Sequence, residues 1–536
     1  MRSPRVNRTL AALAAGLAIG GPAAAQTSAI AVDALPQLDA WASGALGPTN
    51  GGLAPSLWQG SDPAALAVLF DEGPRAYGSP AAATLAARAL QSSSRSPGGG
   101  PAAQDAVRKR YGALGRLGAA DALAAMVTGQ AAADATILQF GVQAELARGA
   151  DEIACAKANG LLAGETPPPF GFRMRAFCLA RDGDAAGAEL ALEIARQSNA
   201  ADPFVAAAID AMLGRARTSP AGRFDTSFNA ALSIAAKLKP GPNALNSSSS
   251  LALVRVARDA AAPPSLRYGA AVLALRYGLI DSATAKAAIR ASLDAPPAAP
   301  AKKGAKPPPT AVQPLALALK TVETAPEGPE RARALAAAVR RADTPGAALA
   351  IARLFRSDMG QIEPSPELAD VAAAFAKAAL TIGDADRAAA WRAFAPSGAA
   401  ATLDAALAAA GRMDLGGAVD RRIAASGSSA PAAARDVRLL AAFGAPYSET
   451  AAAFAAANAP PAPAPADPAK LAALAAAQAR GAVGETALRA ANLAADGAHR
   501  LDPAALAAIV QALRAVGLEG DARALSVEAL AANLPA

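Results

Sequence analysis

The stretch ALRAVGLEGDARALSVEAL, residues 512–530, contains the pattern that decides the fold. Two segments rich in alanine and leucine flank the short sequence VGLEG, residues 516–520. Glycine often ends a helix in the left-handed conformation, and an acidic residue favours the positive N-terminal end of the next helix. The stretch therefore predicts a helical hairpin.

The same kind of turn recurs at three other places in the chain. Glycine and an acidic residue stand together between helical segments in GRLGAADA (residues 115–122), RDGDA (181–185) and IGDADRA (382–388). Each turn predicts the bend of another hairpin.

Helix starts recur as well, because an aspartate precedes a proline at Asp62, Asp202, Asp467 and Asp502. Aspartate caps a helix, and proline suits the first helical position, where no N–H is needed. Helical spacing predicts that two groups of residues each share one face, namely Leu190, Ala191, Ile194 and Ala195, and Leu506, Ile509, Val510 and Leu513.

Composition points to the same fold class. Of the 536 residues 53% are hydrophobic but only 4% are aromatic, because alanine fills much of the apolar class. Alanine has the highest helix propensity, whereas strands need the scarce β-branched and aromatic residues. The chain is therefore expected to be all-α, with helices in close contact over a large area, because each buried alanine removes little surface from water.

At Leu513, Gly517, Asp521-Ala522 and Ala529-Leu530 the first stretch resembles the tetratricopeptide-like repeat, in which paired helices stack into a superhelix. The resemblance covers five or six hairpins, without a steady period of about 34 residues. It implies an irregular, alanine-rich helical-hairpin solenoid with proline-rich linkers. It also implies a binding scaffold without catalytic residues.

The N-terminus has the order of a secretory signal. Arg2, Arg5 and Arg8 precede an apolar run over residues 10–19 and the small residues 23–25. This order predicts a signal peptide over residues 1–25, cut between Ala25 and Gln26, and a periplasmic or secreted protein. The alternative is an uncleaved anchor, but a bilayer span needs about 20 apolar residues. Removing three arginines lowers the formal charge of +7 to a small surplus, so no nucleic-acid partner is expected.

Cys155 and Cys178 are the only cysteines of the chain. They fall on two predicted helices, over residues 151–159 and 170–181, joined by a turn with three prolines. An oxidising compartment favours a disulfide between them, the alternative being two buried free thiols.

The expected organisation follows from the composition along the chain. The irregular lead-in over residues 26–61 contains Trp41 and Trp58, which we expect to pack on the first helices, with sugar binding as the alternative. Proline- or serine-rich segments cover residues 92–101, 240–250, 295–314 and 458–465. The predicted parts are a helical module with the Cys155–Cys178 hairpin (62–239), a short helical module flanked by disordered linkers (240–314), a third module (315–457), a proline-rich linker (458–467) and C-terminal hairpins (468–536).

Lys302, Lys303 and Lys306 lie among prolines and alanines in the third proline-rich segment. A solvated, extended linker is expected there, with contact to an anionic lipid or polymer as the alternative.

Catalytic and cofactor motifs are scarce. The single histidine, His499, is expected in a loop or capping role between two helices. No G-x-S-x-G, P-loop or dinucleotide motif occurs, so no cofactor is expected. A partial calcium-loop pattern at Asp182, Asp184, Gly187 and Glu193 lacks oxygen ligands at its fifth and ninth positions, so no metal is expected either.

Carboxylates keep one enzymatic alternative open. Exported helical superhelices also occur beside lytic transglycosylase domains, whose chemistry needs a protonated carboxylic acid in a cleft. Glu145, Glu165 and Glu449 are formally available, but no Glu-Ser dipeptide marks one of them.

The sequence favours a non-enzymatic exported scaffold of the bacterial cell envelope that binds a protein or polymer partner. One alternative is a peptidoglycan- or carbohydrate-active enzyme that uses carboxylates. Another is a structural envelope component that contacts anionic lipid or polymer. The identity of the partner and the oligomeric state stay open.

Overall fold

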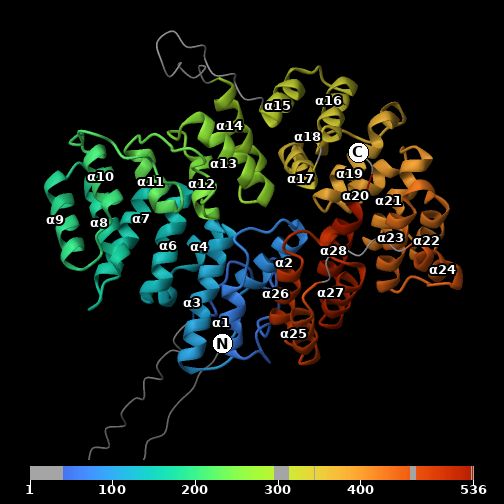
Figure 1. Cartoon of the computed structure of the whole chain (residues 1–536), viewed down its shortest axis with the longest axis horizontal. Helices are drawn as coiled ribbons and strands as arrows, with labels where there is room; N and C mark the ends of the chain where they lie inside the picture. Colours follow the sequence, from blue (N-terminus) through green and yellow to red (C-terminus); the bar gives the residue numbers. More distant parts are fainter. Residues whose placement is uncertain (1–39, 295–312, 343, 459–465, 533, 535–536) are drawn as a thin grey trace, which may run out of the picture. The chain divides into compact units, whose positions relative to one another are not determined.

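The structure is a computed structural model that describes residues 40–294, 313–342, 344–458, 466–532 and 534 (Figure 1). Over these residues it contains 28 α-helices, four short 3-10 helices and two isolated β-bridges, with no strand. The predicted all-α class is confirmed for this part of the chain. No helix described there has the length and apolarity that crossing a bilayer requires. The predicted signal peptide and Lys302, Lys303 and Lys306 lie outside the described residues.

The lead-in packs on the first helices through a cluster of aromatic rings. Trp41 and Trp58 are both buried, and their ring centroids lie 6.2 Å and 5.3 Å from that of Phe70. The buried Arg110 donates to the carbonyl oxygens of Trp41 and Leu90. The expected packing role of the two tryptophans is confirmed. The helices of this part are α1 (Pro63–Asp71), α2 (Pro80–Gln91) and α3 (Gly100–Leu117).

The serine-rich segment after α2 does not separate two modules. Ser92 and Ser94 are buried, and Ser92 forms an isolated parallel bridge with Leu46 of the lead-in. Small hydroxyl side chains allow this close approach, and Leu53 donates its N–H to Ser92 Oγ at 2.8 Å. The segment therefore belongs to the packed N-terminal part.

The next part of the chain contains the disulfide. Cys155 on α7 and Cys178 on α8 are bonded, with their Cα atoms 5.8 Å apart, as the sequence predicts. The helices of this part are α4 (Ala120–Met126), α5 (Gly129–Ala133), α6 (Ala135–Arg148), α7 (Asp151–Ala158), η1 (Asn159–Leu162), α8 (Pro169–Arg181), α9 (Ala185–Gln197), α10 (Pro203–Met212), α11 (Ser227–Ala235), α12 (Ser250–Arg258), α13 (Pro264–Tyr277) and α14 (Ser282–Leu293).

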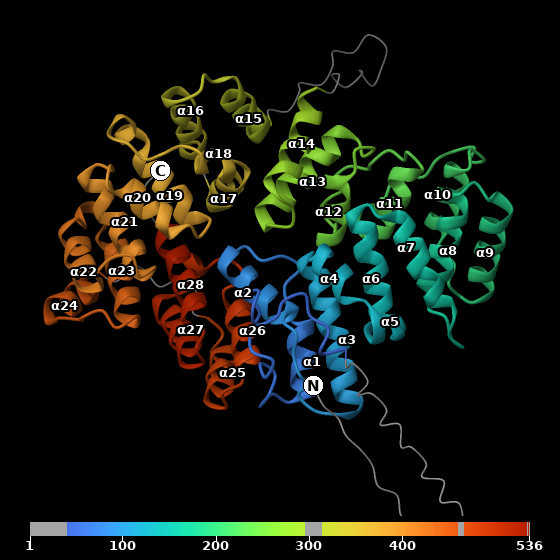
Figure 2. The ribbon, with the colours of Figure 1, turned by 180° about the vertical axis from the view of Figure 1, so that it is seen from behind.

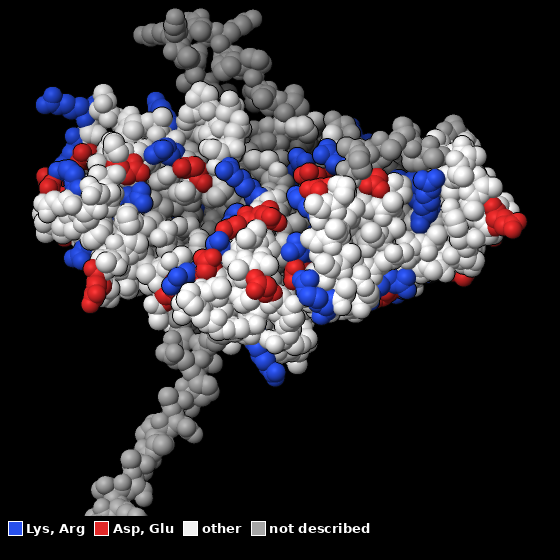
Figure 3. All heavy atoms as spheres, turned by 60° about the horizontal axis from the view of Figure 1, so that its bottom comes forward, with Lys and Arg blue, Asp and Glu red and all other residues white. Residues whose placement is uncertain are grey.

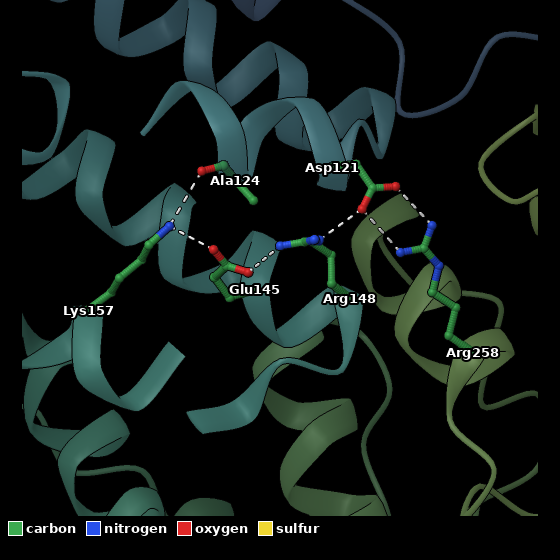
Figure 4. A network of polar contacts seen from close by, with 6 residues as sticks. All are labelled: Asp121, Ala124, Glu145, Arg148, Lys157 and Arg258. Atoms are coloured by element: carbon green, nitrogen blue, oxygen red, sulfur yellow. Dashed lines mark hydrogen bonds and ion pairs between the residues drawn. The ribbon is translucent and has the colours of Figure 1, made fainter. Parts of the chain in front are cut away.

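A network of ion pairs joins α4, α6, α7 and α12 (Figure 4). Glu145 is buried and accepts from Lys157 and Arg148, each at 2.7 Å. Arg148 also donates to Asp121 at 2.8 Å, and Asp121 accepts from Arg258 at 3.0 Å. Because the charges alternate and Glu145 has two cationic donors, the network fixes these four helices relative to one another.

The third and fourth parts continue the same architecture of short helices. Between residues 313 and 458 the helices are α15 (Pro314–Thr324), α16 (Pro329–Arg340), α17 (Pro345–Leu354), α18 (Arg356–Gly360), η2 (Pro366–Leu368), α19 (Ala369–Thr381), α20 (Ala385–Arg392), α21 (Ser397–Ala409), α22 (Leu415–Ala424), η3 (Gly427–Ser429), α23 (Ala430–Ala442) and α24 (Glu449–Ala457). The C-terminal helices are α25 (Pro468–Ala479), α26 (Val483–Leu493), η4 (Ala498–Arg500), α27 (Pro503–Ala515) and α28 (Glu519–Ala531).

The predicted helix starts are confirmed. Asp62, Asp202, Asp467 and Asp502 each accept a backbone N–H of the first turn of α1, α10, α25 and α27, respectively. The predicted turns are confirmed too, because Gly118, Gly183, Gly383 and Gly517 adopt positive φ between paired helices. The pairs α8 and α9, α19 and α20, and α27 and α28 pack against each other.

The last helices also pack against the first ones. Helix α2 contacts both α26 and α28, which lie beside it in Figures 1 and 2. Tyr77 Oη donates to Asn492 at 2.7 Å, and Arg88 on α2 forms an ion pair with Asp521 on α28 at 2.6 Å. Contacts in this fold are therefore not limited to hairpins that follow each other along the chain.

One predicted helical face is only half correct. On α9 the alanines Ala191 and Ala195 are buried, but Leu190 is 62% exposed and Ile194 is 38% exposed. The helix packs on α8 through its small residues, which permit the closer approach. On α27 all four predicted face residues are buried, as expected.

Candidate functional site

Four adjoining cavities are lined by residues from α2, α13, α17, α19 and α28, among other elements. One of about 490 Å³ shares lining residues with each of the other three, whose volumes are about 390, 270 and 310 Å³. The shared residues include Thr84, Arg353, Arg356, Thr381 and Glu528. We call these adjoining cavities the junction cleft, because helices from the beginning, middle and end of the chain line them.

Glu528 on α28 is the buried carboxyl group of the cleft. Its Oε2 accepts from Ser79 Oγ at 2.7 Å and from the N–H of Ala81 at 3.0 Å, and its Oε1 accepts from the N–H of Ala498 at 3.0 Å. Burial raises the pKa of Glu528 above its usual range, against these hydrogen bonds and the nearby charge of Arg353. Because both oxygens have donors, the carboxyl group connects the start of α2 and η4 to α28.

His499 and Lys377 line the same cavity of about 270 Å³ as Glu528. Burial, with Arg435 and Arg500 nearby, lowers the pKa of His499, which favours the neutral imidazole. Burial also lowers the pKa of Lys377, whose amine donates to the carbonyl oxygen of Leu534 at 2.8 Å. The expected position of His499 between two helices is confirmed, since it lies in η4 ahead of α27.

Two arginines three residues apart line the cavity of about 490 Å³. Arg353 donates to the carbonyl oxygens of Leu275 at 3.0 Å and Arg276 at 2.7 Å. Burial lowers the pKa of Arg353 to about 10, and the charge of Arg356 acts in the same direction. Arg356 is exposed, and no hydrogen-bond or ion-pair partner is found for it among the described residues.

Two residues that line the cavity of about 390 Å³, together with Arg356, have buried N–H groups without an acceptor among the described residues. Arg387 donates to the carbonyl oxygen of Met359 at 2.9 Å, but its Nε–H is buried without an acceptor in the described part of the chain. The indole N–H of Trp391 is likewise buried without an acceptor among the described residues. The Trp391 ring stacks on Phe375 at a centroid distance of 4.7 Å.

In contrast, the acidic residues that line the cleft all have donors. Asp521 pairs with Arg88, and Asp121 pairs with Arg148 and Arg258. Asp384 accepts the N–H of Arg387 at 3.0 Å and caps α20. Four lining cations form no ion pair among the described residues, namely Arg353, Arg356, Lys377 and Arg387. Only two lining carboxylates, those of Asp384 and Glu528, accept solely from uncharged donors, so the unpaired cations outnumber the unpaired carboxylates.

The carboxylates that the sequence offers for catalysis do not lie in the cleft. Glu145 belongs to the ion-pair network of Figure 4, and Glu165 and Glu449 are exposed. In the partial calcium pattern, Asp184 caps α9 through the N–H of Gly187. Over the described residues no group of three or more His, Cys, Asp or Glu could hold a metal ion.

Sequence reasoning did not identify Arg353, Arg356 or Glu528. A signal exists for Glu528, because it stands among small and apolar residues in ALSVEALA, residues 524–531. A charged residue on the buried face of a helix indicates a specific partner. The two arginines in ARLFRSD, residues 352–358, carry a weaker signal, since Leu354 and Phe355 between them are buried.

Comparisons with family models, curated proteins and solved structures found no match for this chain.

Proposed function

We propose that the protein is an exported, non-enzymatic scaffold that binds an extended segment of a partner in the bacterial cell envelope. The observation that supports this function is the set of four adjoining cavities that share lining residues. Adjoining cavities offer neighbouring subsites, which suit an extended ligand more than one small molecule.

The disulfide and the helical hairpins agree with this proposal. The disulfide between Cys155 and Cys178 fits a protein that works outside the cytoplasm. Recurrent helical hairpins, stacked through small residues, supply a rigid frame on which side chains from distant segments converge.

The raised pKa of Glu528 supports one second candidate, a carbohydrate-active enzyme with this residue as general acid. The hydrogen bonds argue against it, because both carboxyl oxygens already accept from Ser79, Ala81 and Ala498. Muropeptide release by the purified protein that is lost in Glu528→Gln, with the variant still folded, would reverse the ranking.

Site-specific photo-crosslinking tests the scaffold function. Thr84 is exposed and lines two of the cavities, whereas Glu189 is exposed on α9, away from the lining residues. A photoreactive amino acid at position 84 should capture a partner from envelope extract, and the same group at position 189 should not. Equal capture at both positions, or none at either, would contradict binding in the junction cleft.

A further inference from the structure

We propose that the junction cleft binds an acidic polypeptide segment, with a carboxylate of that segment received between Arg353 and Arg356. This inference rests on the proposed scaffold function and adds the chemical class of the partner. It is carried by the cations of the cleft and by the scarcity of accessible aromatic faces in its lining.

The first argument is the imbalance between acids and bases. Each lining carboxylate has hydrogen-bond donors of its own, as Asp521 has Arg88 and Glu528 has Ser79. Arg353 and Arg356 form no ion pair with a carboxylate in the described part of the chain. The charge of the nearby Glu528 favours the charged form of Arg353, whereas the charge of Arg356 disfavours it. An acidic ligand would relieve this repulsion and form charge-assisted hydrogen bonds, which are stronger than neutral ones.

The second argument is local. Across the face in Figure 3, acidic and basic side chains are interspersed with broad uncharged areas, as the charged fraction of 18% predicts. This face therefore has no broad area of one sign that would attract an anion away from the cleft. Exposed Arg356 lines two of the cavities, so its guanidinium is accessible to a ligand in either.

A polypeptide fits the cleft better than an anionic polysaccharide. Sugar rings bind on exposed aromatic faces, but Phe375 is 2% exposed and Trp391 is fully buried. The remaining aromatic residues of the lining are Tyr77, which is 6% exposed, and Tyr277, which is half-buried and has the guanidinium group of Arg276 over its ring. Much of the lining consists instead of alanine, leucine, proline and threonine, which suit small apolar side chains between acidic ones.

Fluorescence anisotropy with the mature full chain tests the inference. One labelled peptide alternates glutamate with alanine, and the matched peptide alternates glutamine with alanine. The acidic peptide should bind at least about tenfold more tightly than the neutral one, and added salt should weaken its binding. Arg356→Glu should weaken binding of the acidic peptide about tenfold or more.

The matched control is Arg175→Glu on α8. Arg175 is also exposed and without a partner in the described residues, but it does not line the cleft. Circular dichroism of both variants shows whether they keep the helical fold. Equal loss in the two variants, or no loss in Arg356→Glu, would overturn the inference.

Other outcomes separate the inference from the proposed function. If both peptides bind equally and Thr84→Trp weakens both, the cleft binds extended segments but does not select acidic ones, and only the inference fails. If an oligogalacturonate binds more tightly than the acidic peptide and depends on Arg356, the polypeptide class is wrong. If no probe binds and position 84 captures nothing from envelope extract, the proposed function fails as well.

Discussion

Ser79 Oγ donates a hydrogen bond of 2.7 Å to Glu528 Oε2, across 449 residues of sequence. Ser79 also caps α2, whose Ala82 N–H it accepts at 3.0 Å. The carboxyl group of Glu528 therefore joins the start of α2 to α28, the last helix of the described residues. The shape of the cleft depends on this junction, because α2 and α28 both line it.

Removing the carboxyl group should destabilise the junction. In Glu528→Gln one amide group would face the backbone N–H of Ala81 or Ala498, and two donors cannot pair. We expect a loss of about 1–3 kcal/mol in the free energy of unfolding, measured by urea denaturation. The control is Glu449→Gln, at an exposed position of α24, which should have little effect. An unchanged midpoint in Glu528→Gln would show that the junction does not contribute to stability.

The disulfide should stabilise the helix pair of α7 and α8. Cys155 and Cys178 are separated by 23 positions, and closing a loop of this size contributes about 3 kcal/mol on the chain-entropy model. Reduction, or the double variant Cys155→Ala with Cys178→Ala, should lower the melting temperature. The double variant should then be insensitive to reductant. Two thiols that react with an alkylating agent in the folded, unreduced protein would contradict the bond.

Stability should depend on pH through His499. Burial, Arg435 and Arg500 lower its pKa from 6.5, so the unfolded chain binds a proton more readily than the folded one. The stability that this difference contributes is present above pH 6.5 and is lost as the pH falls through the folded pKa. Glu528, whose pKa is raised, acts in the opposite sense, because its contribution falls as the pH rises above its unfolded value.

The test is thermal unfolding of the protein and of His499→Gln at pH about 7.5 and about 5.5, either side of the ordinary histidine pKa. The variant should lose less stability on acidification than the unchanged protein does. An identical loss in both proteins would exclude His499 as a source of the pH dependence.

The local features of the fold, namely helix caps and turns, could be predicted from the sequence. Caps such as Asp502 and turns such as that at Gly517 depend on neighbours within one helical turn, so their signals lie in adjacent residues. The cleft depends on residues that meet only after folding, such as Thr84, Arg353 and Glu528. Their spacing of hundreds of residues leaves no periodic signal.

The sequence pattern also did not predict that alanines would be buried in place of larger residues. On α9, spacing alone could not decide which of two adjoining apolar stripes faces α8, and the structure places Ala191 inward and Leu190 outward. Burial of the leucine and isoleucine would remove more apolar area from water, but burial of the alanines lets the backbones of α8 and α9 approach closely, so the fit between neighbouring surfaces decides.

Close packing predicts one more substitution effect, at Gly484 on α26. A Cβ atom there would lie 2.5 Å from the ring of Trp58 and 2.9 Å from the carbonyl oxygen of Leu57, so Gly484→Ala should destabilise the fold by about 1–3 kcal/mol. Gly520, within α28, has no atom within 4 Å of such a Cβ, and its replacement by alanine should be neutral or stabilise the helix by up to about 1 kcal/mol. Both variants add the same methyl group to a helical glycine, so their difference in urea midpoint measures the contact with Trp58. Equal midpoints would show that the lead-in can move away from α26 without loss of stability, and the close packing of the two would then not contribute to the fold.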